Sequence, residues 1–218
     1  MRPSLIIFDC DGVLVDSEPV ANRVLAEMIT QAGLPTSVEE CCTRYVGRTL
    51  ESSIALIEQE LGKALPENWR ADLSRRERSV WEKELCAVPR VEAVLHHLRQ
   101  DEISYCVASS GSKDKMHFTL GHTGLLPLVQ DVLFSATEVA RSKPHPDIFL
   151  HAAQSMGQPS TSCIVIEDSV FGVQGARAAG MRVFGYIADP HTDATGLKQA
   201  GAEVFSDMGE LPALLGLS

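Results

Sequence analysis

The sequence SLIIFDCDG, residues 4–12, decides the fold class of this chain. A short run of β-branched and aromatic residues that ends at a glycine turn is typical of a buried parallel strand. Asp9 and Asp11 come two residues apart at the carboxyl end of this strand, so their side chains point to the same side. In an open α/β sheet, ligands bind at that end of the strands. Two carboxylates this close repel each other unless a cation or a proton lies between them. Two readings remain open here: a divalent metal site with a catalytic carboxylate, or a strand and turn with solvated acids.

Length and composition narrow the class of protein. The chain has 218 residues, which suits one domain or one domain with an insertion. Its 29 acidic and 19 basic residues give a formal net charge of −10, which disfavours binding to nucleic acid or to an anionic membrane. No apolar run approaches the ~18 residues that span a bilayer. The start of the chain is too short for a signal peptide, so we expect a cytoplasmic protein.

The six cysteines show no spacing typical of a metal or redox site. Cys10, Cys106 and Cys163 lie in or beside predicted strands, where a free cysteine behaves as a small apolar residue. Cys41 and Cys42 are adjacent, and the sequence contains no Cys-x-x-Cys pair. We therefore predict reduced, structural thiols.

Further apolar runs resemble the first and alternate with helix-like sequence. Alternating strands and helices predict an α/β fold, a Rossmann-like open parallel sheet with helices on both faces. The predicted strands after the first are 103–108, 132–135, 163–166 and 182–186.

About ninety residues separate the first two predicted strands, far more than a strand-to-strand crossover through one helix requires. Residues 16–86 have helical periodicity and almost no strand signal. We therefore predict an inserted α-helical cap domain at 16–86 and a core domain formed by 1–15 and 87–218. The helices predicted in the insertion are 18–33, 38–45, 50–62 and 67–85.

Polar residues follow three of the later strands. The hydroxyls of Ser109 and Ser110, with the N–H groups of a following helix start, have the chemistry to cradle an anion. Lys143 lies beside two prolines that restrict the backbone around it. Glu167 and Asp168 follow the fourth strand. Carboxylates gathered at one sheet edge imply a divalent cation, and hard oxygen ligands suit Mg²⁺.

Taken together, these residues resemble the four ordered signatures of the haloacid dehalogenase-like hydrolases. The signatures are the string DCDGVLVDSE at 9–18, Ser109, Lys143 within KPHPD, and Glu167-Asp168. The helical insertion after the first signature resembles the branch that contains β-phosphoglucomutase and small sugar phosphatases.

This resemblance implies a role for each matching residue. Asp9 is the expected nucleophile that forms an aspartyl-phosphate, and Asp11 is the expected general acid and base. Lys143 neutralises the nucleophile and the transferring group, while Ser109 donates a hydrogen bond to the phosphoryl group. Ser110 is expected to bind the substrate beside it.

The resemblance also implies a Mg²⁺ site and a reaction. Asp9, the Asp11 carbonyl and Asp168 are the expected ligands, with Glu167 bound directly or through water.

Asp11 argues against dehalogenation, because expelling a halide requires no acid. Phosphonatases carry a lysine in the insertion, and no lysine occurs between Asp16 and Lys63.

A phosphomutase of the β-phosphoglucomutase type is the alternative. Mutases carry a histidine and an arginine at places that correspond here to Ala21 and Leu50, so hydrolysis is favoured.

The expected partner is a small phosphorylated metabolite, namely a sugar, sugar-acid or polyol phosphate. Arg48, after a glycine break in the insertion, is interpreted either as a substrate contact or as plain surface charge.

Overall fold

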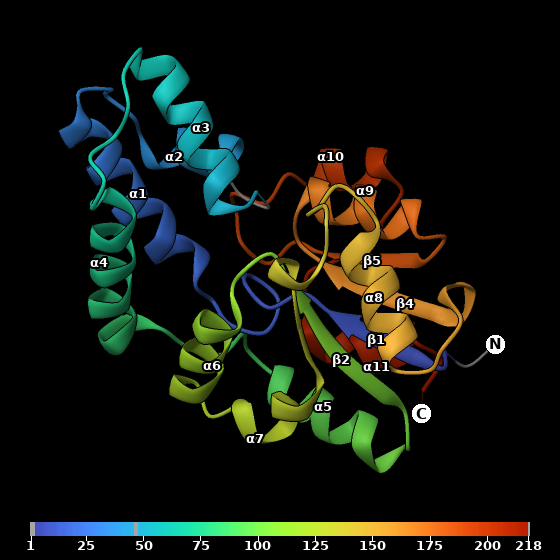
Figure 1. Cartoon of the computed structure of the whole chain (residues 1–218). Coiled ribbons are helices and arrows are strands. Elements are labelled where there is room, and N and C mark those ends of the chain that lie inside the picture. Colours follow the sequence, from blue (N-terminus) through green and yellow to red (C-terminus); the bar gives the residue numbers. More distant parts are fainter. Residues whose placement is uncertain (1–2, 46–47, 218) are drawn as a thin grey trace.

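A parallel β-sheet forms the centre of the computed structural model, which describes residues 3–45 and 48–217. The strands lie in the order β3-β2-β1-β4-β5-β6 (Figure 1). The predicted sheet is therefore confirmed, and a short sixth strand joins its edge. The strands are β1 Leu5–Phe8, β2 Ser104–Ser109, β3 Leu133–Ser135, β4 Cys163–Glu167, β5 Arg182–Tyr186 and β6 Glu203–Phe205.

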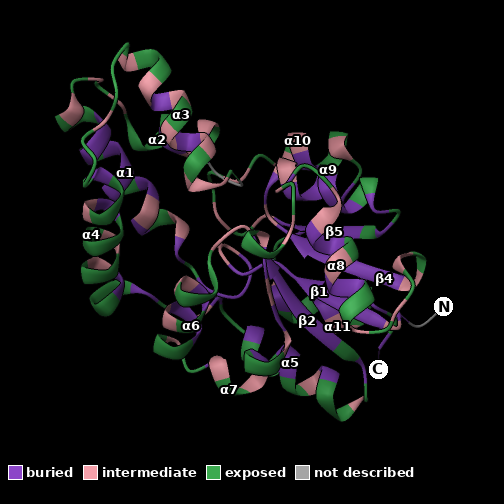
Figure 2. Ribbon diagram, viewed as in Figure 1, coloured by how far each residue is buried: buried purple, intermediate pink, exposed green. Residues whose placement is uncertain are grey.

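The strand β1 lies in the middle of the sheet and is buried on both faces. Its last residue, Phe8, is opposite Val107 of β2 and Ile166 of β4. This register brings the carboxyl ends of three strands side by side, so the polar residues that follow them lie at one edge of the sheet. Figure 2 shows the buried strands between helices whose outer faces are exposed.

Helices cover both faces of the sheet, as the sequence predicts. Leu5 and Ile7 pack in one apolar cluster with α8 and α9, whereas Ile6 and Phe8 pack in another with α5 and α11. None of the helices in the two described ranges is long and apolar enough to cross a membrane. The helices outside the insertion are α5 Val91–Gln100, α6 Lys113–His122, α7 Leu126–Val129, α8 Asp147–Ser155, α9 Val170–Ala178, α10 Ala194–Ala200 and α11 Leu211–Leu214, with 3₁₀ turns at Gln130–Val132, Ala136–Glu138, Ser160–Ser162 and Met208–Glu210.

The inserted segment between β1 and β2 forms a helical group at the side of the sheet (Figure 1). Each helix lies within two residues of its predicted bounds. Local signals explain this agreement: Gly33 and Gly62 end two helices in the left-handed conformation, and Ser37 begins another in a capping box with Glu40. The helices are α1 Glu18–Ala32, α2 Val38–Arg44, α3 Leu50–Leu61 and α4 Trp69–Glu84.

Two chain segments connect this helical group to the sheet, and they run side by side. Val15 and Ala87 form an antiparallel bridge. The N–H of Asp16 donates to the Cys86 carbonyl at 2.9 Å, and the N–H of Val88 donates to the Leu14 carbonyl at 2.9 Å. At its base, the insertion is therefore joined to the sheet by one pair of hydrogen-bonded connecting segments.

The cysteines of the chain are free thiols, as predicted. Cys10, Cys106 and Cys163 are buried in or beside the sheet, and Cys41 is buried in the insertion, while its neighbour Cys42 is partly buried. These positions agree with a structural role in packing.

Candidate active site

A buried ion-paired triad lies at the carboxyl edge of the sheet. The Lys143 Nζ atom is 2.6 Å from Asp9 Oδ1 and 2.7 Å from Glu167 Oε1, and it also donates to the Ala108 carbonyl at 3.2 Å. Burial opposes the charge of the lysine, but the two carboxylates raise the pKa of Lys143 above its ordinary value. Burial raises the pKa of Asp9 from 3.8 to about 7, although Lys143 acts in the opposite direction. Three remote segments of the chain thus converge on one charged group.

The carboxylate of Glu167 is held from both ends. Its Oε1 accepts from Lys143, while its Oε2 accepts from the N–H groups of Asp168 and Ser169 and from the Ser169 hydroxyl, at 2.8–2.9 Å. Glycine is required at position 172, because a Cβ there would lie 1.7 Å from Glu167 Oε1.

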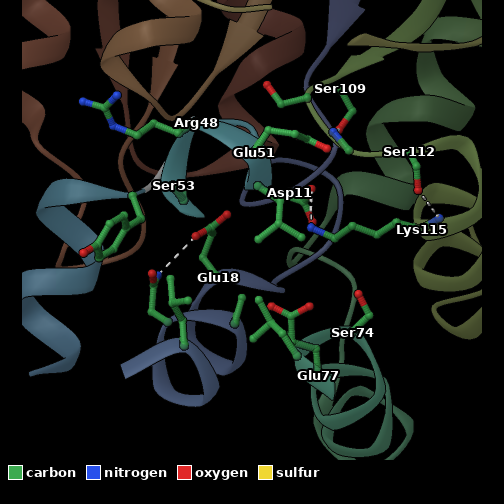
Figure 3. A pocket seen from close by; sticks show the side chains of 18 of the residues that line it. Asp11, Glu18, Arg48, Glu51, Ser53, Ser74, Glu77, Ser109, Ser112 and Lys115 are labelled. Atoms are coloured by element: carbon green, nitrogen blue, oxygen red, sulfur yellow. Dashed lines mark hydrogen bonds and ion pairs between the residues drawn. The ribbon is translucent and has the colours of Figure 1, made fainter. Parts of the chain in front are cut away.

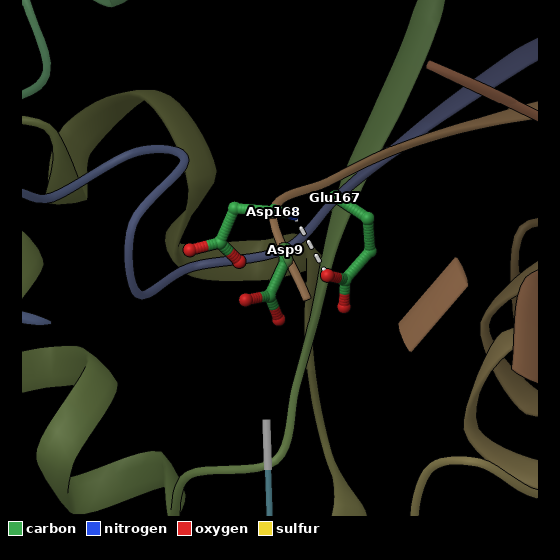
Figure 4. A group of neighbouring side chains, drawn as sticks. All are labelled: Asp9, Glu167 and Asp168. Atoms are coloured by element: carbon green, nitrogen blue, oxygen red, sulfur yellow. Dashed lines mark hydrogen bonds between the residues drawn. The ribbon is translucent and has the colours of Figure 1, made fainter. Parts of the chain in front are cut away.

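Asp9, Glu167 and Asp168 form an acidic cluster beside this lysine (Figure 4). One carboxylate oxygen from each residue lies within 4.8 Å of the others. Burial, followed by repulsion from Glu167 and Asp9, holds the pKa of Asp168 well above its ordinary value. Gly12, with φ +75°, leaves room for this carboxylate, since a Cβ there would lie 1.9 Å from Asp168 Oδ2. Crowded oxygen donors of this kind fit a hard divalent cation, which would relieve their repulsion.

The side chain of Asp11 lies outside this acidic cluster. Its Oδ1 accepts from the Ser17 hydroxyl at 2.5 Å, and its Oδ2 is 2.9 Å from Lys115 Nζ. Burial opposes ionisation, but Lys115 and Ser17 together lower the pKa of Asp11 below 3.8. Lys115 is not among the residues predicted from the sequence. The signal that would have found it is Ser112, which caps α6 and so places Lys115 in the first helical turn after the Ser109 loop.

The hydroxyls of Ser109 and Ser110 lie at the end of β2. Ser109 is buried, and its Oγ accepts from the Gly111 N–H at 3.0 Å. The Ser110 Oγ is buried and has no hydrogen-bond partner among the described residues. A buried hydroxyl without a partner at a cavity wall is suited to bind a ligand oxygen.

Arg48 is an exposed residue of the insertion and follows residue 47, which is outside the described residues. Its Nε donates to the Arg44 carbonyl at 2.8 Å, and its guanidinium lies 4.7 Å from the centre of the Phe171 ring. Arg48 lines the cavity, but both of these contacts are with the protein itself. Its interpretation as a substrate contact stays a prediction.

A cavity of about 590 Å³ lies between the sheet edge and the helical insertion (Figure 3). Its floor includes Asp9, Asp11, Ser109, Lys143 and Asp168. Its opposite wall comes from α1, α3 and α4 of the insertion. This volume suits a small organic molecule, held with one end at the acidic cluster. Wall residues not singled out from the sequence include Asn22, Ser53 and Trp81.

The order and geometry of these residues match a known hydrolase family. The family model for haloacid dehalogenase-like hydrolases covers residues 3–180, a range that contains all four signatures. The chain belongs to this family. The expected resemblance and the expected fold are thereby confirmed.

Members of the haloacid dehalogenase-like family with similar sequences include named phosphatases. The chain is 33% identical to 6-phosphogluconate phosphatase of Escherichia coli (strain K12), over 98% of this chain and 95% of the relative. It is 31% identical to hexitol phosphatase A of the same organism, over 88% and 87% of the two chains. A solved structure of a haloacid dehalogenase-like protein of unknown function from Agrobacterium tumefaciens is 38% identical, with a TM-score of 0.82 and coverage of 98% and 97%. The expectation of an enzyme, a hydrolase of the phosphatase type, is confirmed at this level.

Proposed function

We propose that the chain is a Mg²⁺-dependent phosphatase that hydrolyses a small phosphorylated metabolite through an aspartyl-phosphate on Asp9. The observation that carries this proposal is the Asp9 carboxylate, held by Lys143 on the floor of a cavity large enough for a sugar-sized molecule. The names of the two phosphatase relatives support a sugar, sugar-acid or polyol phosphate as the substrate. The strongly acidic chain agrees with a small-molecule substrate in the cytoplasm rather than with a nucleic acid or membrane partner.

In the first step, Asp9 attacks phosphorus. Lys143 contacts Oδ1, which leaves Oδ2 for the new bond to phosphorus. As the Oδ2–P bond forms, the ester P–O bond breaks and the leaving alcohol takes a proton from Asp11. The hydroxyls of Ser109 and Ser110 donate to the phosphoryl oxygens, and the lysine charge stabilises the transferring group.

In the second step, water attacks the phosphorus of the aspartyl-phosphate. Asp11 accepts the proton of this water, the acyl phosphate bond breaks, and inorganic phosphate leaves. The contacts of Asp11 with Lys115 and Ser17 favour its ionised form, which accepts the proton in this step, and they oppose the protonated form that the first step requires. The cycle thus ends with Asp9 ionised and Asp11 protonated.

The acidic cluster supplies the ligands that a Mg²⁺ ion would require. Asp9 and Asp168 would bind it directly, together with the Asp11 carbonyl. Glu167 would act through water or through Lys143, because both of its carboxylate oxygens already accept hydrogen bonds. When bound, Mg²⁺ supplies positive charge that lets a carboxylate approach a phosphate dianion.

The helical insertion, residues 16–86, serves in this proposal as a cap over a core formed by 1–15 and 87–218. The paired connections around Val15 and Ala87 form its hinge. Closure of such a cap excludes water and completes the substrate site.

The phosphomutase alternative receives less support from the cavity. Ala21 and Leu50, the residues at the places of the mutase histidine and arginine, both line it. Neither side chain transfers a proton or binds a second phosphate. Hydrolysis therefore remains the favoured reaction.

The test is phosphate release by purified protein from an aryl phosphate and from a panel of phosphorylated metabolites in the presence of Mg²⁺. Asp9→Asn should abolish turnover and the trapped phosphoenzyme, and Asp11→Asn should slow turnover by ~10²–10⁴. Asp131→Asn, at an exposed position in the 3₁₀ turn after α7, is the matched control. Full activity of Asp9→Asn would refute the mechanism.

A further inference from the structure

The wall of the cavity opposite the acidic cluster carries its own set of charged residues. Glu18 of α1 and Glu77 of α4 both line the cavity, and both are partly buried. Lys115 from the core lies between these acids and Asp11, and it is attracted by all three. Figure 3 shows Asp11, Glu18, Glu77 and Lys115 facing one space. With Lys115 paired to Asp11 at 2.9 Å, Glu18 and Glu77 have no salt bridge of their own among the described residues.

Buried polar side chains lie on the same wall. Ser53 is only 4% exposed and lines the cavity. The Tyr45 hydroxyl, from a residue that also lines it, is buried without a hydrogen-bond partner among the described residues. Asn22 is also 4% exposed and donates to Glu18 Oε2 at 3.2 Å, which orients that carboxylate. A buried hydroxyl that lines a cavity without a partner points to a ligand that supplies the missing hydrogen bond.

Three arginines also line this cavity, and each contacts another side chain of the protein. Arg70 is ion-paired with Glu51, Arg78 lies over the Phe118 ring at 4.4 Å, and Arg48 lies over Phe171. All three arginines are exposed. The buried part of the wall therefore offers carboxylate oxygens, an amide and a hydroxyl, which are partners for the hydroxyl groups of a ligand.

We propose that Glu18, Glu77 and Ser53 select a phosphate ester whose remaining part is polyhydroxylated and uncharged, and reject one that carries a second anionic group. This inference rests on the proposed function, and it narrows the substrate from sugar, sugar-acid and polyol phosphates to neutral sugar or polyol phosphates. Ionised carboxylates accept hydrogen bonds from hydroxyls and repel a substrate carboxylate.

The experiment compares two substrates that differ at one carbon. Glucitol 6-phosphate and 6-phosphogluconate share chain length and hydroxyl configuration, but the first ends in CH₂OH and the second in a carboxylate. Erythritol 4-phosphate and 4-phosphoerythronate form a shorter matched pair. We expect kcat/KM to be at least about tenfold higher for the neutral member of a pair. A tenfold ratio corresponds to about 1.4 kcal/mol in the transition state.

Variants then assign this ratio to the wall. The double variant Glu18→Gln/Glu77→Gln should lower the ratio at least about fivefold, because the amides keep the shape and lose the repulsion. Glu82→Gln, on the exposed side of the same helix α4, removes an equal charge and should leave the ratio unchanged. Ser53→Ala should raise KM for the neutral ester more than it lowers kcat.

The outcomes separate this inference from the proposed function. Equal or faster hydrolysis of the sugar-acid member overturns the inference, as does a ratio that the double variant does not change. Hydrolysis of an aryl phosphate with no hydrolysis of either pair also overturns it and leaves the phosphatase proposal standing. No hydrolysis of any phosphate ester refutes the proposed function itself.

Discussion

Removing the positive charge of Lys143 is the sharpest test of the buried triad. Lys143→Met keeps most of the side-chain volume but leaves the carboxylates of Asp9 and Glu167, only 10% and 0% exposed, without their cation. Breaking one side of a buried ion pair costs about 3–5 kcal/mol. For a chain of this length each kcal/mol lowers Tm by about 2–4 °C, so we expect a fall of roughly 6–20 °C.

The loss of stability in Lys143→Met should depend on pH, because a carboxylate of the triad can take up a proton in the variant. In the wild type, burial raises the pKa of Asp9 from 3.8 to about 7, so the folded state binds more protons than the unfolded state between these values. Stability therefore falls as pH rises through this window. Without Lys143, which lowers this pKa, the window extends above pH 7. The difference in stability between wild type and variant should thus widen between pH 7 and pH 8.5.

The assay is urea unfolding followed by circular dichroism at pH 6, 7 and 8.5 with a chelator present. Lys198→Met, at an exposed position on α10, is the control for loss of a lysine. The double variant Lys143→Met/Glu167→Gln should recover part of the stability, since only one buried carboxylate remains. A Lys143→Met protein as stable as the wild type at every pH would show that the triad is not a buried charged group.

The other predictions concern the metal, one glycine and the cap. Mg²⁺ should raise Tm of the wild type, and Asp168→Asn should lose this effect. In chelator, Asp168→Asn should be at least as stable as the wild type, because the carboxylate that it removes is crowded by like charges. An unchanged Mg²⁺ response in this variant would exclude Asp168 as a ligand. Gly172→Ala should lower the free energy of unfolding in urea by about 1–3 kcal/mol and reduce activity, because the alanine Cβ displaces Glu167. Gln174→Ala, on the exposed side of α9, is the control and should change neither. Arg48→Ala should raise KM for the best metabolite more than for an aryl phosphate; equal losses on both would contradict a role in specificity.

Much of the fold is local in origin and could be predicted. The central strands are continuous apolar runs, and the helices of the insertion end at Gly33 and Gly62 or begin at the capping residue Ser37. The strand Glu203–Phe205 was not predicted because its three residues begin with an exposed glutamate and only Phe205 is buried, which leaves no apolar run. The strand order also has no local signal, because it depends on where each crossover helix packs.

The candidate site also has a part that the sequence predicts and a part that only the structure shows. Asp9 and Asp11 could be placed together because a strand alternates its side chains, and Ser109, Lys143 and Glu167 could be placed at one sheet edge by their positions after strands. Their roles came from the resemblance to a family. Direct contact between Lys143 and Asp9 joins residues 134 positions apart, and only the sheet order brings them within 2.6 Å.

The sequence by itself determined the sheet, the helical insertion and the position of the four family signatures, because these depend on side-chain period and on residues near in the chain. Tertiary structure alone decided that Asp11 is paired with Lys115 and that Glu18 and Glu77 face the same space. Lys115, Glu18 and Glu77 lie on α6, α1 and α4, which meet only when the insertion packs over the sheet edge. A charged residue is identified as part of a site by its neighbours in space rather than by its neighbours in sequence.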